Sequence, residues 1–397
     1  RIEVSSVLVR DPGKERVPEC KPEWLTTDPE VVFGDPNVDL VVEVMGGEEP
    51  ARTLIGRAIA AGKGVVSANK FLIAKHGHEL LQNAVEKRVD LAFEASVGGG
   101  IPVIRTLREA LASDKVASLH AILNGTCNYI LTRMRDAGLG FSTALAEAQE
   151  LGYAEADPTL DVDGHDAAQK LMVTSMLAFA AKVKPQNVLV EGIRSIDEID
   201  FRFADRFGYT LKHLGIGHDR GQFLELRVHP ALVKKSSVLA HVDGVLNGIF
   251  ITGRALGPCL LVGRGAGDMP TAVSVVADIV DVARSRLDGA QGLATRSIQM
   301  SERAILPASE IETRYYLRFD VGDAPGVVGS IASALGAEGI SIEQMVQEGR
   351  AQSAGEAVPV CIITHQSKEG AVRSALQAIG GKGFMKRPPR LLRIEDV

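Results

Sequence analysis

The sequence predicts an α/β protein in three parts: a doubly wound parallel sheet, an α+β middle region and a small ferredoxin-like module. Three observations support this fold class. Near-continuous apolar strand patterns alternate with amphipathic helical patterns over residues 1–97, as in a parallel sheet covered on both faces. Helical patterns followed by long apolar strand patterns fill residues 98–305. Residues 313–397 follow the order β-α-β-β-α-β.

The first part is predicted from strand patterns at 2–10, 38–47, 64–68 and 89–95 and helical patterns at 49–63 and 72–88. Sheets of this type bind ligands at the carboxyl ends of their strands. Two polar segments lie at such ends, "ANK" at 68–70 and "EASVGGG" at 94–100. We therefore expect ligand-binding residues in these two segments.

The middle part begins with a helical pattern at 101–113, in which Pro102 suits the first turn. Strand patterns follow at 223–233, 245–253 and 259–267. The last part has strand patterns at 314–321, 340–349, 357–365 and 390–397, and helical patterns at 326–339 and 368–380. Residues 287–304 are predicted to link the two parts.

The composition excludes several classes of protein. A net charge of −6, with no basic run, gives no reason to expect nucleic-acid binding. The four cysteines are widely scattered, so neither a disulfide framework nor a zinc motif is indicated. No apolar run is long enough for a membrane span, and no signal-peptide pattern appears. We therefore expect a cytoplasmic protein of 397 residues with an ample hydrophobic core.

Asp166 and Lys170 lie four residues apart at the start of a helical pattern, and so share one helix face. Spacing alone favours an ordinary solvated ion pair. The preceding loop, however, gathers the carboxylates Glu150, Glu155, Asp157, Asp161, Asp163 and Asp166. Carboxylates so close together repel one another unless they meet a substrate ammonium, a metal ion or water. The residues alone leave these three readings open.

Other segments carry weaker signals. The glycines at 98–100 expose backbone groups at a helix start, and "GRGAGDMPTA" at 263–272 forms a second glycine-rich turn before a helix. Both are equally compatible with tight packing. Cys127 is a candidate nucleophile with His120 or His165 as its base, although a single buried cysteine is more often an apolar filler. Lys70 lies at a strand end of the predicted parallel sheet.

Taken together, six segments resemble the homoserine dehydrogenase family, in the order found there. They are "SANK" (67–70), "EASVGGGIP" (94–102), "NGTCNYIL" (124–131), "LGYAEADPTLDVDGHDAAQK" (151–170), "RVHPALV" (227–233) and "GRGAGDMPTA" (263–272). The segment "DAPGVVGSIASALGAEGISIEQMVQ" (323–347) resembles an ACT domain, an amino-acid-sensing module. The resemblance implies a Rossmann-like cofactor domain at 1–97, a substrate and dimerisation domain at 98–305 and an ACT regulatory domain at 313–397.

The resemblance also implies a reaction, the reversible NAD(P)-dependent interconversion of aspartate 4-semialdehyde and homoserine, on the route to threonine, methionine and isoleucine. Lys170 matches the general acid and base of the family. Asp166 and Glu155 match residues that bind the substrate ammonium, and Asp161 matches more loosely. An amine that exchanges a proton near neutrality needs its pKa lowered by burial or by neighbours.

Cofactor and metal residues follow from the same resemblance. Lys70 is expected near the nicotinamide and the substrate, and the backbone at Gly152 and Gly267 is expected to approach the cofactor. A structural sodium ion is expected among residues that match a site made mostly of backbone carbonyls, namely Glu94, Val97, Gly99 and Ile101.

The start of the chain departs from the family pattern. There, a strand, a glycine-rich turn and a helix precede the segment that opens this sequence. We therefore expect an N-terminally truncated member, whose own turnover is in question. The segment "IEVSSVLVRD" resembles the second strand, and Arg10 at its end favours NADP over NAD by meeting a 2′-phosphate.

Two alternative functions remain: a semialdehyde dehydrogenase acting through Cys127, and a non-catalytic amino-acid sensor. In either the dehydrogenase or the sensor, Gly326 and Gly329 match the loop where ACT domains contact amino acids, and we expect threonine as the effector. We also expect a homo-oligomer, a dimer or a tetramer, because isolated sheets have edges to protect.

Overall fold

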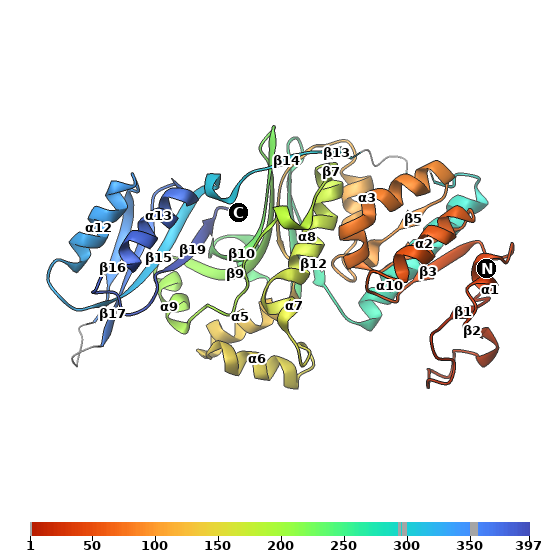
Figure 1. The fold of residues 1–397 in the computed structure, drawn as a ribbon, viewed down its shortest axis with the longest axis horizontal. Coiled ribbons are helices and arrows are strands. Elements are labelled where there is room, and N and C mark those ends of the chain that lie inside the picture. Colours follow the sequence, from red (N-terminus) through yellow and green to blue (C-terminus); the bar gives the residue numbers. More distant parts are fainter. Residues whose placement is uncertain (1, 293–294, 296–299, 350–355) are drawn as a thin grey trace. The chain divides into compact units, whose positions relative to one another are not determined.

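The computed structural model describes all residues except 1, 293–294, 296–299 and 350–355 (Figure 1). The chain forms two compact units. The first unit contains residues 1–113, 172–185 and 264–302, and the second unit contains residues 114–171, 186–263 and 303–397.

The first unit contains a parallel sheet in the order β3-β4-β5, made by Leu40–Glu43, Gly64–Ser67 and Leu91–Ala92. Helices α2 (Ala51–Ala60) and α3 (Lys70–Lys87) connect these strands. Val65 and Val66 are fully buried because a strand in the middle of such a sheet is covered on both faces. The strands and helices that the pattern predicted between residues 38 and 92 are thus confirmed.

The first unit contains several further elements. They are α1 (Glu30–Phe33), the 3-10 helices Pro22–Trp24 and Glu94–Ser96, α4 (Val103–Arg105), a π-helical turn (Thr106–Ala110), α10 (Asp268–Leu287) and the paired strands β7 (Ala181–Lys182) and β13 (Ser301–Glu302). Val282 of α10 packs on Val66 and Ala92, and Arg286 forms an ion pair with Asp39. Helix α10, distant in sequence, therefore covers the parallel sheet.

The prediction of a strand over residues 2–10 was wrong in the strand's length and in the sheet to which it belongs. Only β1 (Val7–Leu8) is a strand, and it pairs with β2 (Leu25–Thr26) in a separate two-stranded sheet. Residues 2–5 are exposed and have no neighbouring strand, so their backbone groups find no ladder partner. Part of the expected linker at 287–304 lies outside the described residues, and its end forms β13 and β14 (Ala304–Ile305).

The second unit is built on one long mixed sheet in the order β12-β11-β6-β9-β10-β19-β15-β17-β16. Its strands are β6 (Val116–Ile122), β9 (Tyr209–Asp219), β10 (Phe223–Lys234), β11 (Leu246–Gly253), β12 (Gly257–Arg264), β15 (Glu312–Gly322), β16 (Ile342–Gln347), β17 (Ala357–Thr364) and β19 (Arg390–Glu395). Strands β8 (Leu189–Val190) and β14 pair with β10, and β18 (Ser367–Lys368) pairs with β15.

Helices α5 (Gly125–Ala137), α6 (Phe141–Glu150), α7 (Thr159–Val162) and α9 (Glu198–Arg206) belong to this unit, with 3-10 turns at Val238–His241 and Ala308–Glu310. The residues of α8 (His165–Ala178) and of the 3-10 turn Pro185–Asn187 are divided between the two units. Leu171 of α8 lies over Gly215 of β9, where an added Cβ would meet Leu123 at 2.9 Å. The glycine allows the residues after β6 to pack closely on β9, which positions the end of β6 beside α8.

The C-terminal module has the predicted β-α-β-β-α-β order, with helices α12 (Val327–Ala337) and α13 (Glu369–Gly380). Its strands lie in the order β19-β15-β17-β16 and are antiparallel. Strand β19 also pairs in parallel with β10, so the module's sheet continues into the middle sheet. This continuity was not predicted.

No helix in the described part of the chain combines the length and the apolar composition that a membrane span requires.

Candidate active site

The N-terminal turn of α8 brings Asp166 and Lys170 together. Gly164, just before the helix, has φ +89°, a backbone conformation that favours glycine. Lys170 Nζ donates to Asp166 Oδ2 at 2.8 Å and to the Leu123 carbonyl at 2.9 Å. Lys170 is only 8% exposed and Asp166 only 4%, so the interpretation as a solvated surface ion pair is excluded.

Asn124 joins this pair to a second carboxylate. Its Nδ2 donates to Asp161 Oδ1 at 2.7 Å and to Asp166 Oδ2 at 2.8 Å. Its Oδ1 accepts from the backbone N–H of Cys127 at 2.8 Å and so caps α5. Asn124 was not singled out from the sequence, although it begins the segment "NGTCNYIL".

Cys127 does not have the surroundings of a nucleophile. It is buried, and its Sγ donates to the Asp161 carbonyl at 3.2 Å. Burial, with Asp161 as the next cause, raises the thiol pKa well above its ordinary value, so the reactive thiolate is disfavoured. Two histidines were considered as a base for this thiol. The ring of His120 contacts the ring of His218 edge to face, and His165 is exposed.

The loop between α6 and α7 carries Glu155 and Gly152, both exposed. Gly152 has φ +74°, and within the described residues the Glu155 carboxylate makes no hydrogen bond. Thr126 of α5 donates from its hydroxyl to the Tyr153 carbonyl at 2.6 Å, which anchors this loop to the helix capped by Asn124. The structure therefore unites Lys170, Asp166 and Asp161, and leaves Glu155 on the adjoining loop.

In the first unit, polar side chains gather at the carboxyl ends of β3 and β4, as predicted for a parallel sheet. Ser67 donates to the buried Glu43 carboxylate at 2.7 Å, and Asn69 accepts from the Leu72 N–H at 3.1 Å to cap α3. Lys70 is the first residue of that helix. Arg10 is exposed and makes no hydrogen bond or ion pair within the described residues.

The two glycine-rich turns of the first unit pack against each other. An added Cβ on Gly99 (φ +54°) would lie 2.7 Å from the Gly265 carbonyl carbon, and the Gly100 N–H donates to the Arg264 carbonyl at 3.2 Å. Gly267 has φ +120° and precedes α10. Glycine is required at these positions by close approach and by backbone conformation.

Glu94 begins the 3-10 turn before these glycines and is buried. Its carboxylate accepts from the Ile104 and Arg105 N–H groups at 2.7 and 2.8 Å, while its own N–H donates to Asp278. Burial raises the pKa of Glu94 to about 7 and that of Asp278 to about 6.

These parts define a class of protein. A parallel sheet with polar residues at its strand ends suits a dinucleotide, and a buried lysine held by carboxylates suits proton transfer to a small polar substrate. Together these features describe a dinucleotide-dependent oxidoreductase that carries a ferredoxin-like module.

Comparison with known proteins identifies the family. Residues 1–94 match the NAD-binding domain of homoserine dehydrogenase, residues 102–280 match homoserine dehydrogenase, and residues 315–381 match the ACT domain. A homoserine dehydrogenase of Synechocystis sp. is 42% identical over 99% of this chain and 92% of that protein. The chain belongs to the homoserine dehydrogenase family, and it is an oxidoreductase with an NAD(P)-binding domain and an ACT domain.

Solved structures agree. A homoserine dehydrogenase from Thiobacillus denitrificans superposes with a TM-score of 0.88 at 43% identity, covering 94% of this chain and 85% of that one. A hyperthermophilic archaeal homoserine dehydrogenase in complex with NADPH gives a TM-score of 0.57 at 28% identity, covering 65% of this chain and 75% of that one. The predicted family and fold class are confirmed.

Proposed function

We propose that this protein catalyses the reversible NADP(H)-dependent interconversion of L-aspartate 4-semialdehyde and L-homoserine, a step towards threonine, methionine and isoleucine. The observation that carries the proposal is the buried arrangement of Lys170, Asp166 and Asn124 in a chain of this family. When bound, the nicotinamide cofactor supplies or accepts the hydride.

Lys170 moves the proton. In the direction of reduction its ammonium group donates a proton to the aldehyde oxygen, which becomes the hydroxyl of homoserine. In oxidation the neutral amine takes the same proton back. Asp166 and the Leu123 carbonyl both accept from Nζ, so they fix its position before the substrate binds.

The carboxylates recognise the substrate ammonium. Asp161 and Asp166 are held side by side by the Asn124 amide, which prevents them from turning away from each other. Two carboxylates and one lysine leave an excess negative charge, which suits the ammonium group of the substrate. We assign Glu155, on the loop anchored through Thr126, as a further carboxylate for the same group.

The cofactor residues are assigned by their resemblance to positions of the family. Gly267, directly before the long helix α10, has φ +120°, a backbone conformation that favours glycine. We assign Gly267, Gly152 and Lys70 to cofactor binding, and Arg10 to the 2′-phosphate that distinguishes NADP from NAD. The exposed guanidinium of Arg10 and the NADPH in the archaeal relative support NADP.

We also propose a structural sodium ion at Glu94, Val97, Gly99 and Ile101. Both oxygens of the Glu94 carboxylate already accept backbone N–H groups, so this residue would contribute its carbonyl oxygen. Gly98 and Gly99 both have positive φ, a backbone conformation that favours glycine. Backbone carbonyl oxygens, the ligands that these residues would contribute, suit a hard cation.

Regulation and assembly complete the proposal. The backbone at Gly326 (φ +85°) begins α12, and neither Gly326 nor Gly329 has an atom within 4 Å of an added Cβ, so the turn is open to a ligand such as threonine. The sheet ends at β12 and β16, and exposed apolar Val262 and Met345 on these edge strands favour a homo-oligomer. We place the protein in the cytoplasm, where amino acids are made with NADP(H).

The test compares oxidation of L-homoserine with that of 4-hydroxybutanoate, which lacks the ammonium group, using NADP+ and NAD+ separately. We expect turnover of homoserine, preference for NADP+ and little turnover of 4-hydroxybutanoate. In Asp161→Asn, discrimination between the two alcohols is expected to fall by about tenfold, the equivalent of about 1.4 kcal/mol. A folded protein that oxidises neither alcohol with either cofactor would contradict the proposal.

A further inference from the structure

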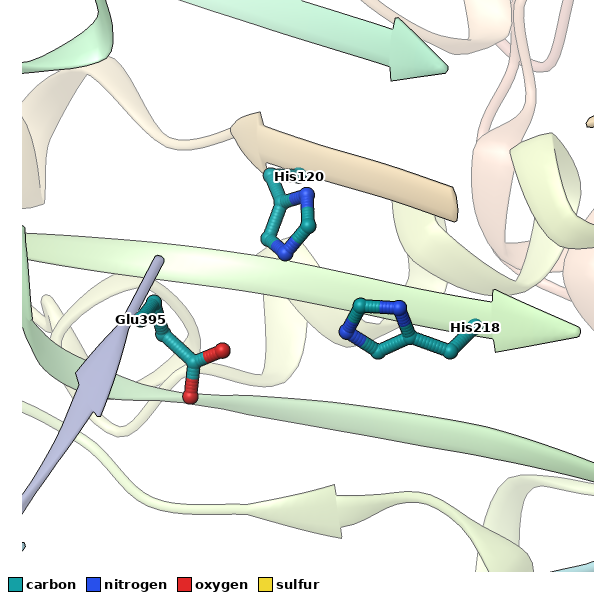
Figure 2. Close-up of side chains that lie close together, drawn as sticks. All are labelled: His120, His218 and Glu395. Carbon is teal, nitrogen blue, oxygen red and sulfur yellow. The ribbon is translucent and has the colours of Figure 1, made fainter. Parts of the chain in front are cut away.

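Three potential metal ligands meet on one face of the second unit's sheet, outside the candidate active site. They are His120 of β6, His218 of β9 and Glu395 of β19 (Figure 2). One ligand atom from each lies within 4.8 Å of the other two. His120 pairs with Ile216, two residues before His218, so the imidazoles are diagonal neighbours on the same face.

Both imidazoles are free to bind a metal. Within the described residues neither makes a hydrogen bond or an ion pair, and they contact each other edge to face with centroids 4.9 Å apart. Nδ1 of His120 is buried without a partner, which is unfavourable for a polar atom.

Neighbouring charges decide which ion fits. Glu395 is bound by Arg227, whose Nη1 lies 2.5 Å from Oε1, and Arg227 also pairs with buried Glu225 at 2.6 Å. Glu225 in turn contacts the half-exposed Arg220 at 2.8 Å. The guanidinium of Arg227 repels every cation, so a hard ion attracted mainly by charge gains little here. A metal that binds imidazole nitrogen strongly is favoured, because two of the three ligands are imidazole rings.

We propose that His120, His218 and Glu395 bind one zinc ion, which fastens the last strand of the C-terminal module to the middle sheet. Zn²⁺ takes two histidines and a carboxylate at roughly 2.0–2.2 Å, which places tetrahedral ligands roughly 3.4 Å apart. The side chains therefore have to close by at most about 1.4 Å from the separation of 4.8 Å. Three protein ligands leave a fourth position for water.

Metal binding should be read out without reference to catalysis. The full chain, treated with chelator and then dialysed, is titrated with Co²⁺, whose visible absorption is intense when four ligands surround it and weak when six do. We expect one Co²⁺ per chain, an intense band and displacement by Zn²⁺. No intense band in folded protein, or the weak band of a six-coordinate ion, would show adventitious binding and overturn the proposal.

Matched variants assign the ligands. His218 is only partly buried, so His218→Gln is expected to fold and to bind Co²⁺ at least about tenfold more weakly. His365→Gln, which replaces an exposed histidine elsewhere in the same unit, is the control and should bind like the parent. Equal affinity in the parent and in His218→Gln would overturn the assignment.

A second measurement follows thermal unfolding of the parent and of His218→Gln. Because a ligand that binds only the folded state stabilises it, Zn²⁺ should raise the melting temperature of the parent and chelator should reverse the rise. The same additions should leave the melting temperature of His218→Gln unchanged. A melting temperature of the parent that does not respond to Zn²⁺ would contradict a fastening role.

Discussion

Replacing Asn124 with serine is expected to release the substrate carboxylates while leaving α5 capped. The Asn124 amide donates to Asp161 and Asp166 at 2.7 and 2.8 Å, and its oxygen accepts from the Cys127 N–H. Hydrogen bonds to charged groups contribute about 1.5–3 kcal/mol each. Asp166 keeps Lys170 and Asp161 is partly exposed, so the low end applies, and Asn124→Ser should lower the free energy of unfolding by about 3 kcal/mol.

Alanine at the same position separates the cap from the carboxylate contacts. Serine caps a helix about as well as asparagine, so Asn124→Ala should cost about 1 kcal/mol more than Asn124→Ser. Urea unfolding followed by circular dichroism measures both differences.

Steady-state oxidation of homoserine measures the effect on the site. With Asp161 and Asp166 no longer held side by side, KM for homoserine should rise by about tenfold in Asn124→Ser, the equivalent of about 1.4 kcal/mol. An Asn124→Ser variant whose free energy of unfolding lies within about 0.5 kcal/mol of the parent value, and whose KM is unchanged, would contradict this role of Asn124.

Three further predictions concern other parts of the chain. Arg393→Met leaves the buried Glu369 and its neighbour Glu191 with the half-exposed Arg373 as their remaining shared cation. It should lower the free energy of unfolding by about 3 kcal/mol, with partial recovery on adding Glu369→Gln, and strictly additive losses would contradict this. Cys127→Ala should keep the rate of homoserine oxidation within about threefold of the parent, because a buried thiol with a raised pKa takes no part in the reaction. A folded variant without activity would support Cys127 as a nucleophile. The pKa of Glu94 is about 7 in the folded protein against an ordinary 4.5, so its contribution to stability is complete below pH 4.5 and lost as the pH rises to 7. In Glu94→Gln, the free energy of unfolding should change less with pH between 4.5 and 7 than in the parent. An unchanged pH dependence would exclude the Glu94 carboxyl as its cause.

The sequence predicted most elements because their patterns are local. The strands and helices between residues 38 and 92 and those of the C-terminal module lie where period and turn residues placed them. The Asp166–Lys170 pair was predictable for the same reason, since helical spacing alone puts the two side chains on one face.

The contacts that sequence reasoning missed join distant segments. Asn124 reaches carboxylates 37 and 42 residues away, and this depends on how β6 ends beside α8. His120 and His218 meet only because β6 and β9 pair in one register. The continuation of the middle sheet through β10 and β19 likewise depends on pairing between segments of different parts.

The central claim is that Lys170 transfers the proton, and one experiment tests it most directly. The rate of NADPH oxidation by aspartate 4-semialdehyde in a single turnover is compared among the parent, Lys170→Met and Lys212→Met. Lys212 is another buried lysine of the same unit, bound to Asp243 at 2.6 Å, so its variant controls for loss of a buried charge. The account predicts a rate about 10²–10⁴-fold lower in Lys170→Met, with NADPH affinity unchanged, and near-parental chemistry in Lys212→Met. Equal rates in the two folded variants would contradict it.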